Sequence, residues 1–140
     1  GAWAEAVEQL ADVIAPYNPD LLVGIESRGF LVAAPLAFRM GCGFVMIRKA
    51  GKLPCAVTRQ EYDLEYGSAA IELHRDALEQ GDRVVIVDDV LATGGTARAA
   101  VRLVESLGAT VVGLEFLVEL TALDGRRGLD DYRIESVIEY

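Results

Sequence analysis

The chain has 140 residues and a formal net charge of -9, and 52% of its residues are hydrophobic and 25% charged. This composition is typical of a soluble globular protein with one domain. The acidic balance argues against a nucleic-acid-binding protein, because phosphate backbones attract an excess of Lys and Arg. No apolar run approaches the ~20 residues of a membrane span, and the first residues do not resemble a signal peptide. Cys42 and Cys55 are expected to be free thiols in a reducing cytoplasm.

Helices and strands are predicted to alternate in the first part of the chain. The predicted elements are a helix over 3–14, a buried strand over 21–25, a helix over 29–40 and a strand over 43–48. Pro16 ends the helical spacing of the first element. Pro35 indicates a kink or a late start of the second helix, because proline inside a helix costs roughly 3 kcal/mol.

Apolar density falls between residues 49 and 67, which indicates a long loop or a mobile ribbon. Loops of this length in compact domains are usually functional. The later predicted elements are strands over 70–74, 83–88 and 110–120, a helix over 96–107 with Gly108 as its C-cap, and an edge strand over 135–138. Strands that alternate with helices indicate an α/β fold with a mostly parallel sheet flanked by helices.

Residues 84–96, VVIVDDVLATGGT, give the strongest indication of function. A buried strand leads into Asp88 and Asp89, and a turn of small residues then opens a helix, at the strand end where α/β sheets bind ligands. Backbone N–H groups at such a turn approach an anion closely where glycine removes the Cβ. The predicted phosphate-binding residues are Ala92, Thr93, Gly94, Gly95 and Thr96. The two aspartates would repel a phosphate and are assigned to the ribose 2′- and 3′-hydroxyls; a solvated acidic turn is the alternative.

Two further strand ends carry cations. Arg28 follows the first strand, and Arg48, Lys49 and Lys52 lie within five residues after the second. In an acidic chain such a basic group stands out. By itself it would be read as a solvated loop, but the phosphate turn at a neighbouring strand end favours an anion-binding role.

Residues 84–96 resemble the phosphoribosyl-pyrophosphate motif of type I phosphoribosyltransferases. The segments RGF at 28–30, RKAGKLP at 48–54, YDLEYG at 62–67 and LVELT at 117–121 extend the similarity to the adenine phosphoribosyltransferase family over nearly the whole chain. The resemblance implies a type I phosphoribosyltransferase fold and conversion of adenine and 5-phosphoribosyl-1-pyrophosphate to AMP and pyrophosphate. It also implies Mg²⁺ held mainly by the substrate and a homodimer in the cytoplasm.

The resemblance assigns the basic residues to the leaving group. Arg28 and Lys52 would contact pyrophosphate, and Lys49 would help to close the loop. Arg48 would reach into the neighbouring subunit's site.

The resemblance also implies the catalytic and base-binding residues. Glu65 would be the acid/base that hydrogen bonds to the purine imidazole, and Tyr66 would shield the site as the loop closes. Such a lid excludes water, which would otherwise hydrolyse the activated sugar. Val90 and Leu120 would flank the purine, with plain core packing as the alternative.

Family members usually begin with a segment that covers the purine, and this sequence begins after it. We therefore expect one phosphoribosyltransferase domain over residues 1–140 that lacks this segment. One alternative is a phosphoribosyltransferase for xanthine, hypoxanthine or guanine, and another is a regulatory domain that senses phosphoribosyl pyrophosphate without turning it over. Glu65 favours an enzyme, and the motifs at 52–54 and 65–67 favour adenine.

Overall fold

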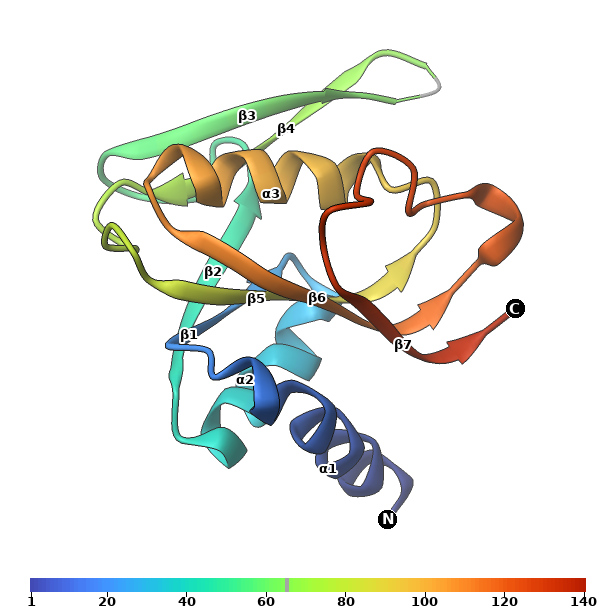
Figure 1. Cartoon of the computed structure of the whole chain (residues 1–140). Coiled ribbons are helices and arrows are strands. Elements are labelled where there is room, and N and C mark those ends of the chain that lie inside the picture. Colours follow the sequence, from blue (N-terminus) through green and yellow to red (C-terminus); the bar gives the residue numbers. More distant parts are fainter. Residues whose placement is uncertain (65) are drawn as a thin grey trace.

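Seven strands form a mixed sheet in the order β3-β4-β2-β1-β5-β6-β7 in the computed structural model, which describes residues 1–64 and 66–140 (Figure 1). The strands are β1 Leu21–Ile25, β2 Gly43–Lys49, β3 Val57–Asp63, β4 Ser68–His74, β5 Arg83–Leu91, β6 Thr110–Glu119 and β7 Ile134–Glu139. The helices are α1 Ala2–Ile14, α2 Arg28–Met40 and α3 Gly95–Ser106, with 3-10 turns η1 Ala15–Tyr17 and η2 Thr121–Leu123. β2, β1, β5, β6 and β7 are parallel to one another, so the predicted α/β class is confirmed.

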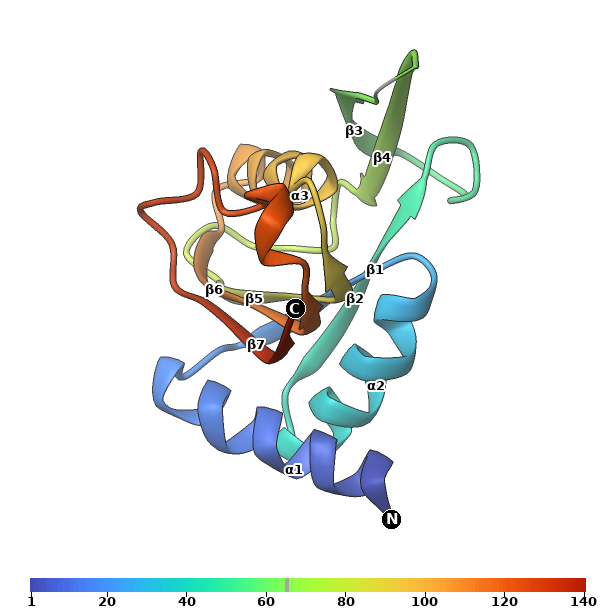
Figure 2. The same cartoon turned by 90° about the vertical axis from the view of Figure 1, so that its right-hand side faces the viewer.

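Two apolar layers hold the helices on opposite faces of the sheet. α3 packs on one face through Ala100 and Val104, which are fully buried. α1 and α2 pack on the other face through residues such as Leu10 and Leu36 (Figures 1 and 2). Residues 84–87 of β5 are fully buried between these layers, as the unbroken apolar run predicts.

α2 begins at Arg28, so the predicted late start of this helix is wrong and Pro35 lies inside it. Proline removes one backbone hydrogen bond, which leaves the carbonyl four residues earlier, at Leu31, without its helical partner. Leu31 is on the solvent side of the helix, with 64% of its surface exposed, where water reaches that carbonyl. Burial of Val32 and Leu36 on the opposite side holds the helix on the sheet.

Residues 57–63 form β3, so the segment 49–67, predicted as a long loop or a mobile ribbon, contains a strand in its second half. β3 pairs antiparallel with β4, from Val57↔His74 to Asp63↔Ser68. The resulting hairpin continues from the end of β2 and projects over α3 (Figures 1 and 2). None of the residues of this strand is fully buried and three of the seven are exposed, so its pattern is too polar to resemble a core strand.

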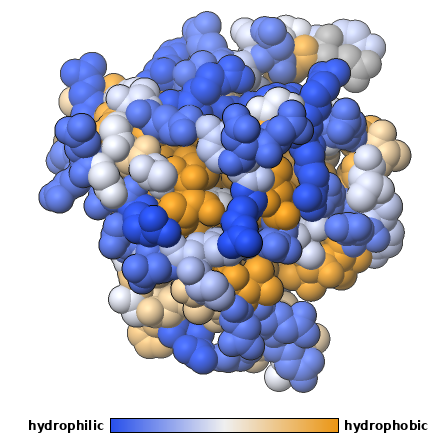
Figure 3. Space-filling view, in the orientation of Figure 1, coloured by the Kyte–Doolittle hydropathy of each residue, from blue (hydrophilic) through white to orange (hydrophobic). Residues whose placement is uncertain are grey.

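β5 continues past Asp88 to Leu91, because its pairing with β6 runs to Leu91↔Glu119. The predicted strand over 83–88 therefore ended three residues too early, and Asp88 and Asp89 lie on the strand itself, ahead of the turn at 92–96. β7 is an edge strand, as predicted. Hydrophilic residues cover most of the face seen in Figure 1, with apolar areas between them (Figure 3). None of the helices in residues 1–64 and 66–140 is long and apolar enough to cross a membrane.

Candidate active site

The carboxyl ends of β1, β2 and β5 surround a pocket of about 550 Å³. Because parallel strands end at the same edge of the sheet, motifs that are far apart in the sequence meet there. The predicted residues that line the pocket are Arg28, Arg48, Lys49, Asp88, Asp89, Val90, Ala92 and Thr96. Tyr62 of β3 also lines it, which places the hairpin at its rim.

The phosphate turn forms a smaller hollow of about 90 Å³ beside this pocket. The hollow is lined by Asp88, Phe116 and every predicted phosphate-binding residue from Ala92 to Thr96. Gly94 is the N-cap of α3 and has a φ of 86°, a left-handed conformation that favours glycine. The first N–H groups of a helix lack helical partners, and the helix dipole favours an anion there. The turn therefore has the space and the donors that a phosphate group needs.

Asp88 and Asp89 carry different charges although they are neighbours. Burial raises the pKa of Asp88 to about 8, and its hydrogen bond with the Asp89 side chain and the nearby Asp89 charge add to the rise. Asp89 forms an ion pair with Arg28, with 2.8 Å between Oδ2 and Nε. At neutral pH the pair therefore offers one protonated carboxyl and one carboxylate, which together donate to and accept from a diol.

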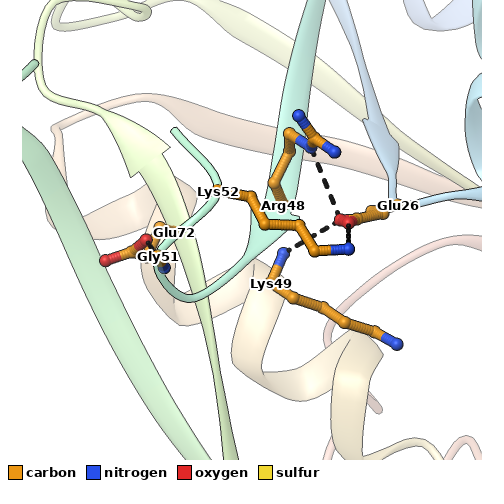
Figure 4. Close-up of polar contacts among 6 residues, drawn as sticks. All are labelled: Glu26, Arg48, Lys49, Gly51, Lys52 and Glu72. Carbon is orange, nitrogen blue, oxygen red and sulfur yellow. Dashed lines mark hydrogen bonds and ion pairs between the residues drawn. The ribbon is translucent and has the colours of Figure 1, made fainter. Parts of the chain in front are cut away.

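The basic residues Arg48 and Lys49 at the end of β2 and Lys52 after it converge on Glu26, which lies directly after β1 (Figure 4). The Lys52 Nζ is 2.8 Å from Glu26 Oε1, and the Arg48 Nε is 3.4 Å from Oε2. Burial acts to raise the pKa of Glu26, but hydrogen bonds from Lys52, the Lys49 backbone N–H and Arg48 outweigh it and hold the pKa below its usual value. No role was predicted for Glu26 from the sequence, although it lies between the end of a predicted strand and Arg28.

The comparisons with known proteins agree with this geometry. Residues 2–138 match the phosphoribosyl transferase domain family. The adenine phosphoribosyltransferase of Rhodospirillum centenum is 57% identical over 129 residues, which cover 92% of this chain and 75% of that relative. The chain belongs to the adenine phosphoribosyltransferase family.

Solved structures of this family share the fold. The adenine phosphoribosyltransferase of Thermoanaerobacter pseudethanolicus has a TM-score of 0.97 and 52% identity, over 99% of this chain and 81% of that one. The Saccharomyces cerevisiae adenine phosphoribosyltransferase, solved with adenine and an imino-altritol bisphosphate, has a TM-score of 0.90 and 40% identity, over 96% and 78% of the two chains. The type I phosphoribosyltransferase fold implied by the sequence motifs is thus confirmed.

Other predicted residues of this adenine phosphoribosyltransferase family member lie outside the main pocket. Tyr66 lies between β3 and β4 and is 87% exposed. Leu120 follows β6 and lines neither of the two hollows. Glu65, the predicted acid/base, lies outside the described residues. The roles of these three residues therefore stay predictions from the sequence.

Proposed function

We propose that the protein transfers the phosphoribosyl group of 5-phosphoribosyl-1-pyrophosphate to adenine, releasing pyrophosphate and forming AMP. The observation that carries this proposal is that a phosphate turn, an acid pair and a basic cluster surround one pocket. Identity of about half over nearly the whole chain to adenine phosphoribosyltransferases supports the choice of base.

The geometry suggests how each part of the substrate is held. The 5′-phosphate binds the N–H groups and hydroxyls of residues 92–96, and the ribose hydroxyls bind Asp88 and Asp89. Pyrophosphate then extends toward Arg28 and the cations after β2. As the bond to pyrophosphate breaks, the sugar acquires oxocarbenium character, and the charge of Asp89 stabilises it electrostatically.

The acid/base and lid residues are proposals from the family motif. Glu65 would exchange a proton with the purine imidazole as N9 attacks, and Tyr66 would cover the site. Tyr62, on the same hairpin, already lines the pocket, which supports a hairpin that closes over the substrate. Val90 lines the pocket and is proposed to flank the purine together with Leu120.

Mg²⁺ is proposed to bind to the protein together with the substrate, mainly through the substrate's phosphate oxygens. Mg²⁺ prefers phosphate oxygens and water together with one or two carboxylates, and Asp89 in the pocket is a carboxylate of this kind. The ion would neutralise charge on pyrophosphate, while the protein residues bind and orient the sugar. A cytoplasmic location is proposed as well, since the free thiols of Cys42 and Cys55 suit a reducing compartment.

A homodimer is supported by an apolar surface on α2. Leu31 is 64% exposed and Phe38 is 88% exposed. They lie seven residues apart, and therefore on one side of the helix, with Ala34 between them. Met46 of β2 is also 40% exposed, two residues before Arg48, the residue proposed to reach into the neighbouring subunit's site. Apolar residues exposed together in this way are typical of protein interfaces.

The proposed function is tested by incubating the full-length protein with Mg²⁺, phosphoribosyl pyrophosphate and each purine in turn. We expect AMP and pyrophosphate from adenine and little product from hypoxanthine, guanine or xanthine. A clear preference for a 6-oxopurine would overturn the choice of base. Binding of phosphoribosyl pyrophosphate without pyrophosphate release from any purine would favour the regulatory alternative.

A further inference from the structure

The side chain of Glu26 is only 5% exposed, yet it lies among the cations of the proposed pyrophosphate site. It accepts hydrogen bonds from the Arg48 Nε and the Lys49 backbone N–H, both at 3.4 Å, and it forms an ion pair with the Lys52 Nζ at 2.8 Å. These groups approach the carboxylate from the end of β2 and the turn after it, whereas Glu26 itself follows β1 (Figure 4). One buried carboxylate therefore joins the ends of two strands.

A second buried carboxylate holds the same segment from the other side. Glu72 of β4 is 7% exposed, and its Oε1 accepts from the Gly51 backbone N–H at 2.6 Å. Gly51 has a φ of 85°, so the chain makes a tight turn at this point. The segment 49–52 is thus fixed at its backbone by Glu26 and Glu72 (Figure 4).

Among the residues that the structure describes, Lys49 is the cation of this cluster that forms no ion pair. The Lys49 side chain points away from Glu26 (Figure 4), and Lys49 lines the pocket together with Arg28 and Arg48. Three cations, Arg48, Lys49 and Lys52, therefore lie around the single carboxylate of Glu26, and this segment keeps a net positive charge for an anion.

Buried carboxylates are costly unless paired, so Glu26 constrains the long side chains of Arg48 and Lys52 strongly. A free lysine or arginine side chain loses rotamer entropy when a ligand orders it. If Glu26 orders these side chains in advance, an incoming pyrophosphate does not bear that cost.

We propose that Glu26 is a positioning residue that sets the affinity of the pyrophosphate subsite, with Glu72 fixing the backbone of the same segment. This inference rests on the proposed function. Glu26 acts through Arg48, Lys49 and Lys52 rather than through contact with the reacting atoms. Its removal should weaken pyrophosphate binding and leave the phosphate turn and the ribose site intact.

The test uses the reverse reaction, in which AMP and pyrophosphate occupy different parts of the pocket. For Glu26→Gln we expect the KM for pyrophosphate to rise roughly tenfold while the Kd for AMP stays within about twofold of the wild-type value. Glu26→Asp keeps the charge and should recover part of the loss. Glu72→Ala should act in the same direction as Glu26→Gln, because it frees the Gly51 N–H.

Glu8→Gln is the matched control, because it also removes a carboxylate that pairs with an arginine, Arg39, at 2.6 Å. It lies on α1, across the sheet from α3, and should change neither constant. An unchanged KM for pyrophosphate in Glu26→Gln would overturn the inference, because Glu26 would then have no effect on pyrophosphate binding. A lower KM would overturn it as well, because Glu26 would then compete with pyrophosphate for the cations. A parallel loss of AMP affinity and thermal stability would overturn it too, in favour of a general structural role.

Failure of the proposed function would be recognised separately, as absence of turnover by the wild-type protein. In that case calorimetric titration with pyrophosphate still tests the inference. The wild-type protein should bind pyrophosphate more tightly than Glu26→Gln, and equal affinities would refute the positioning role.

Discussion

Asp88 and Asp89 show how neighbouring residues of one type take different states. Burial of the Asp88 carboxyl raises its pKa to about 8, and the nearby charge of Asp89 adds to the rise. Asp89 is paired with Arg28. Ribose hydroxyls donate and accept, so a protonated and a charged carboxyl at adjacent positions suit them better than two carboxylates do.

Replacing both aspartates by alanine, Asp88→Ala with Asp89→Ala, should raise the KM for phosphoribosyl pyrophosphate by roughly a hundredfold, since two hydrogen-bonding groups to one diol are lost. The fold should remain, because the strand is held by its apolar residues at 84–87. Steady-state kinetics and circular dichroism check the two parts. The exposed pair Asp130→Ala with Asp131→Ala is the matched control and should behave as wild type; a normal KM in the first variant would remove the acid pair from the ribose site.

The acid/base role proposed for Glu65 rests on the family motif, because Glu65 lies outside the residues that the structure describes. Glu65→Gln should lower kcat for AMP formation by about a hundredfold or more, the usual contribution of a general acid or base. The KM for phosphoribosyl pyrophosphate should change little, because binding uses other residues. Single-turnover kinetics separate chemistry from product release, and normal turnover would remove Glu65 from the mechanism.

At the scale of elements, the phosphate turn is supported by the segment that follows β6. A Cβ on Gly125 would lie 2.5 Å from the Ala92 carbonyl oxygen and 2.8 Å from the Leu91 Cγ, so this segment lies against the turn backbone. Arg98 of α3 connects the two parts, donating to the Thr93 carbonyl at 3.1 Å and to the Arg127 carbonyl at 2.8 Å. These contacts therefore fix the backbone of the phosphate turn in the absence of a ligand.

Gly125→Ala should therefore displace the Ala92 carbonyl and the N–H groups that follow it. We expect the KM for phosphoribosyl pyrophosphate to rise roughly tenfold with a smaller change in kcat, because a displacement near 1 Å is enough to disturb such a site. Arg98→Lys, which keeps the charge but loses the planar fork of donors, should act more weakly in the same direction. Unchanged kinetics in both variants would show that the turn holds its shape alone.

The elements that the sequence predicted well are those whose burial decides their structure. β1 and the first part of β5 have apolar runs that fit only a strand buried on both faces, and α3 has apolar residues on one face only. β3 was missed because it is half exposed and polar, and its pairing with β4 decides its conformation. The extension of β5 through Asp88 and Asp89 depends likewise on β6, a partner that local sequence does not reveal.

The same reasoning applies to the site. Gly94 and the small residues around it predict a phosphate turn from the sequence alone. Glycine has no Cβ, so the backbone can adopt a positive φ and approach an anion closely. The role of Glu26 was not visible, since its partners lie more than twenty positions away, on the far side of another helix and strand. Contacts of this kind follow from topology, and the sequence alone does not supply the distances.

At the scale of the whole molecule, one buried carboxyl links stability to pH. Glu115 of β6 is 1% exposed, and neither of its oxygens has a hydrogen-bond partner among the residues that the structure describes. It lies opposite Glu135 in the parallel pairing of β6 with β7, and the Tyr17 hydroxyl donates to Glu135 at 3.3 Å. Burial raises the pKa of Glu115 to about 8, and the charge of Glu135 adds to the rise.

A carboxyl whose pKa is higher in the folded state contributes stability that is fully present below its unfolded pKa and is lost as pH rises through the folded value. The free energy of unfolding should therefore fall between about pH 4.5 and about pH 8, at no more than about 1.4 kcal/mol per pH unit for one group. Asp88 contributes in the same direction. Glu115→Gln should flatten the pH dependence of Tm measured by calorimetry, whereas Glu105→Gln, at an exposed position, should not. Equal slopes in wild type and Glu115→Gln would show that Glu115 is already ionised at neutral pH.

The apolar surface of α2 connects the assembly of the molecule with its chemistry. Phe38→Asp places a charge on the residue of this surface that is 88% exposed in the single chain, so it should leave the fold unchanged but prevent burial against a second copy. Sedimentation velocity should show a dimer for the wild type and a monomer for this variant. Arg48 lines the pocket of its own chain, and its proposed reach into the neighbouring subunit's site is an additional contact that the monomer loses, so the KM for pyrophosphate should rise in this variant. Phe38→Leu keeps the surface apolar and should remain a dimer with normal kinetics. A monomeric wild type, or a Phe38→Asp dimer, would move the interface away from α2 and remove Arg48 from the shared site.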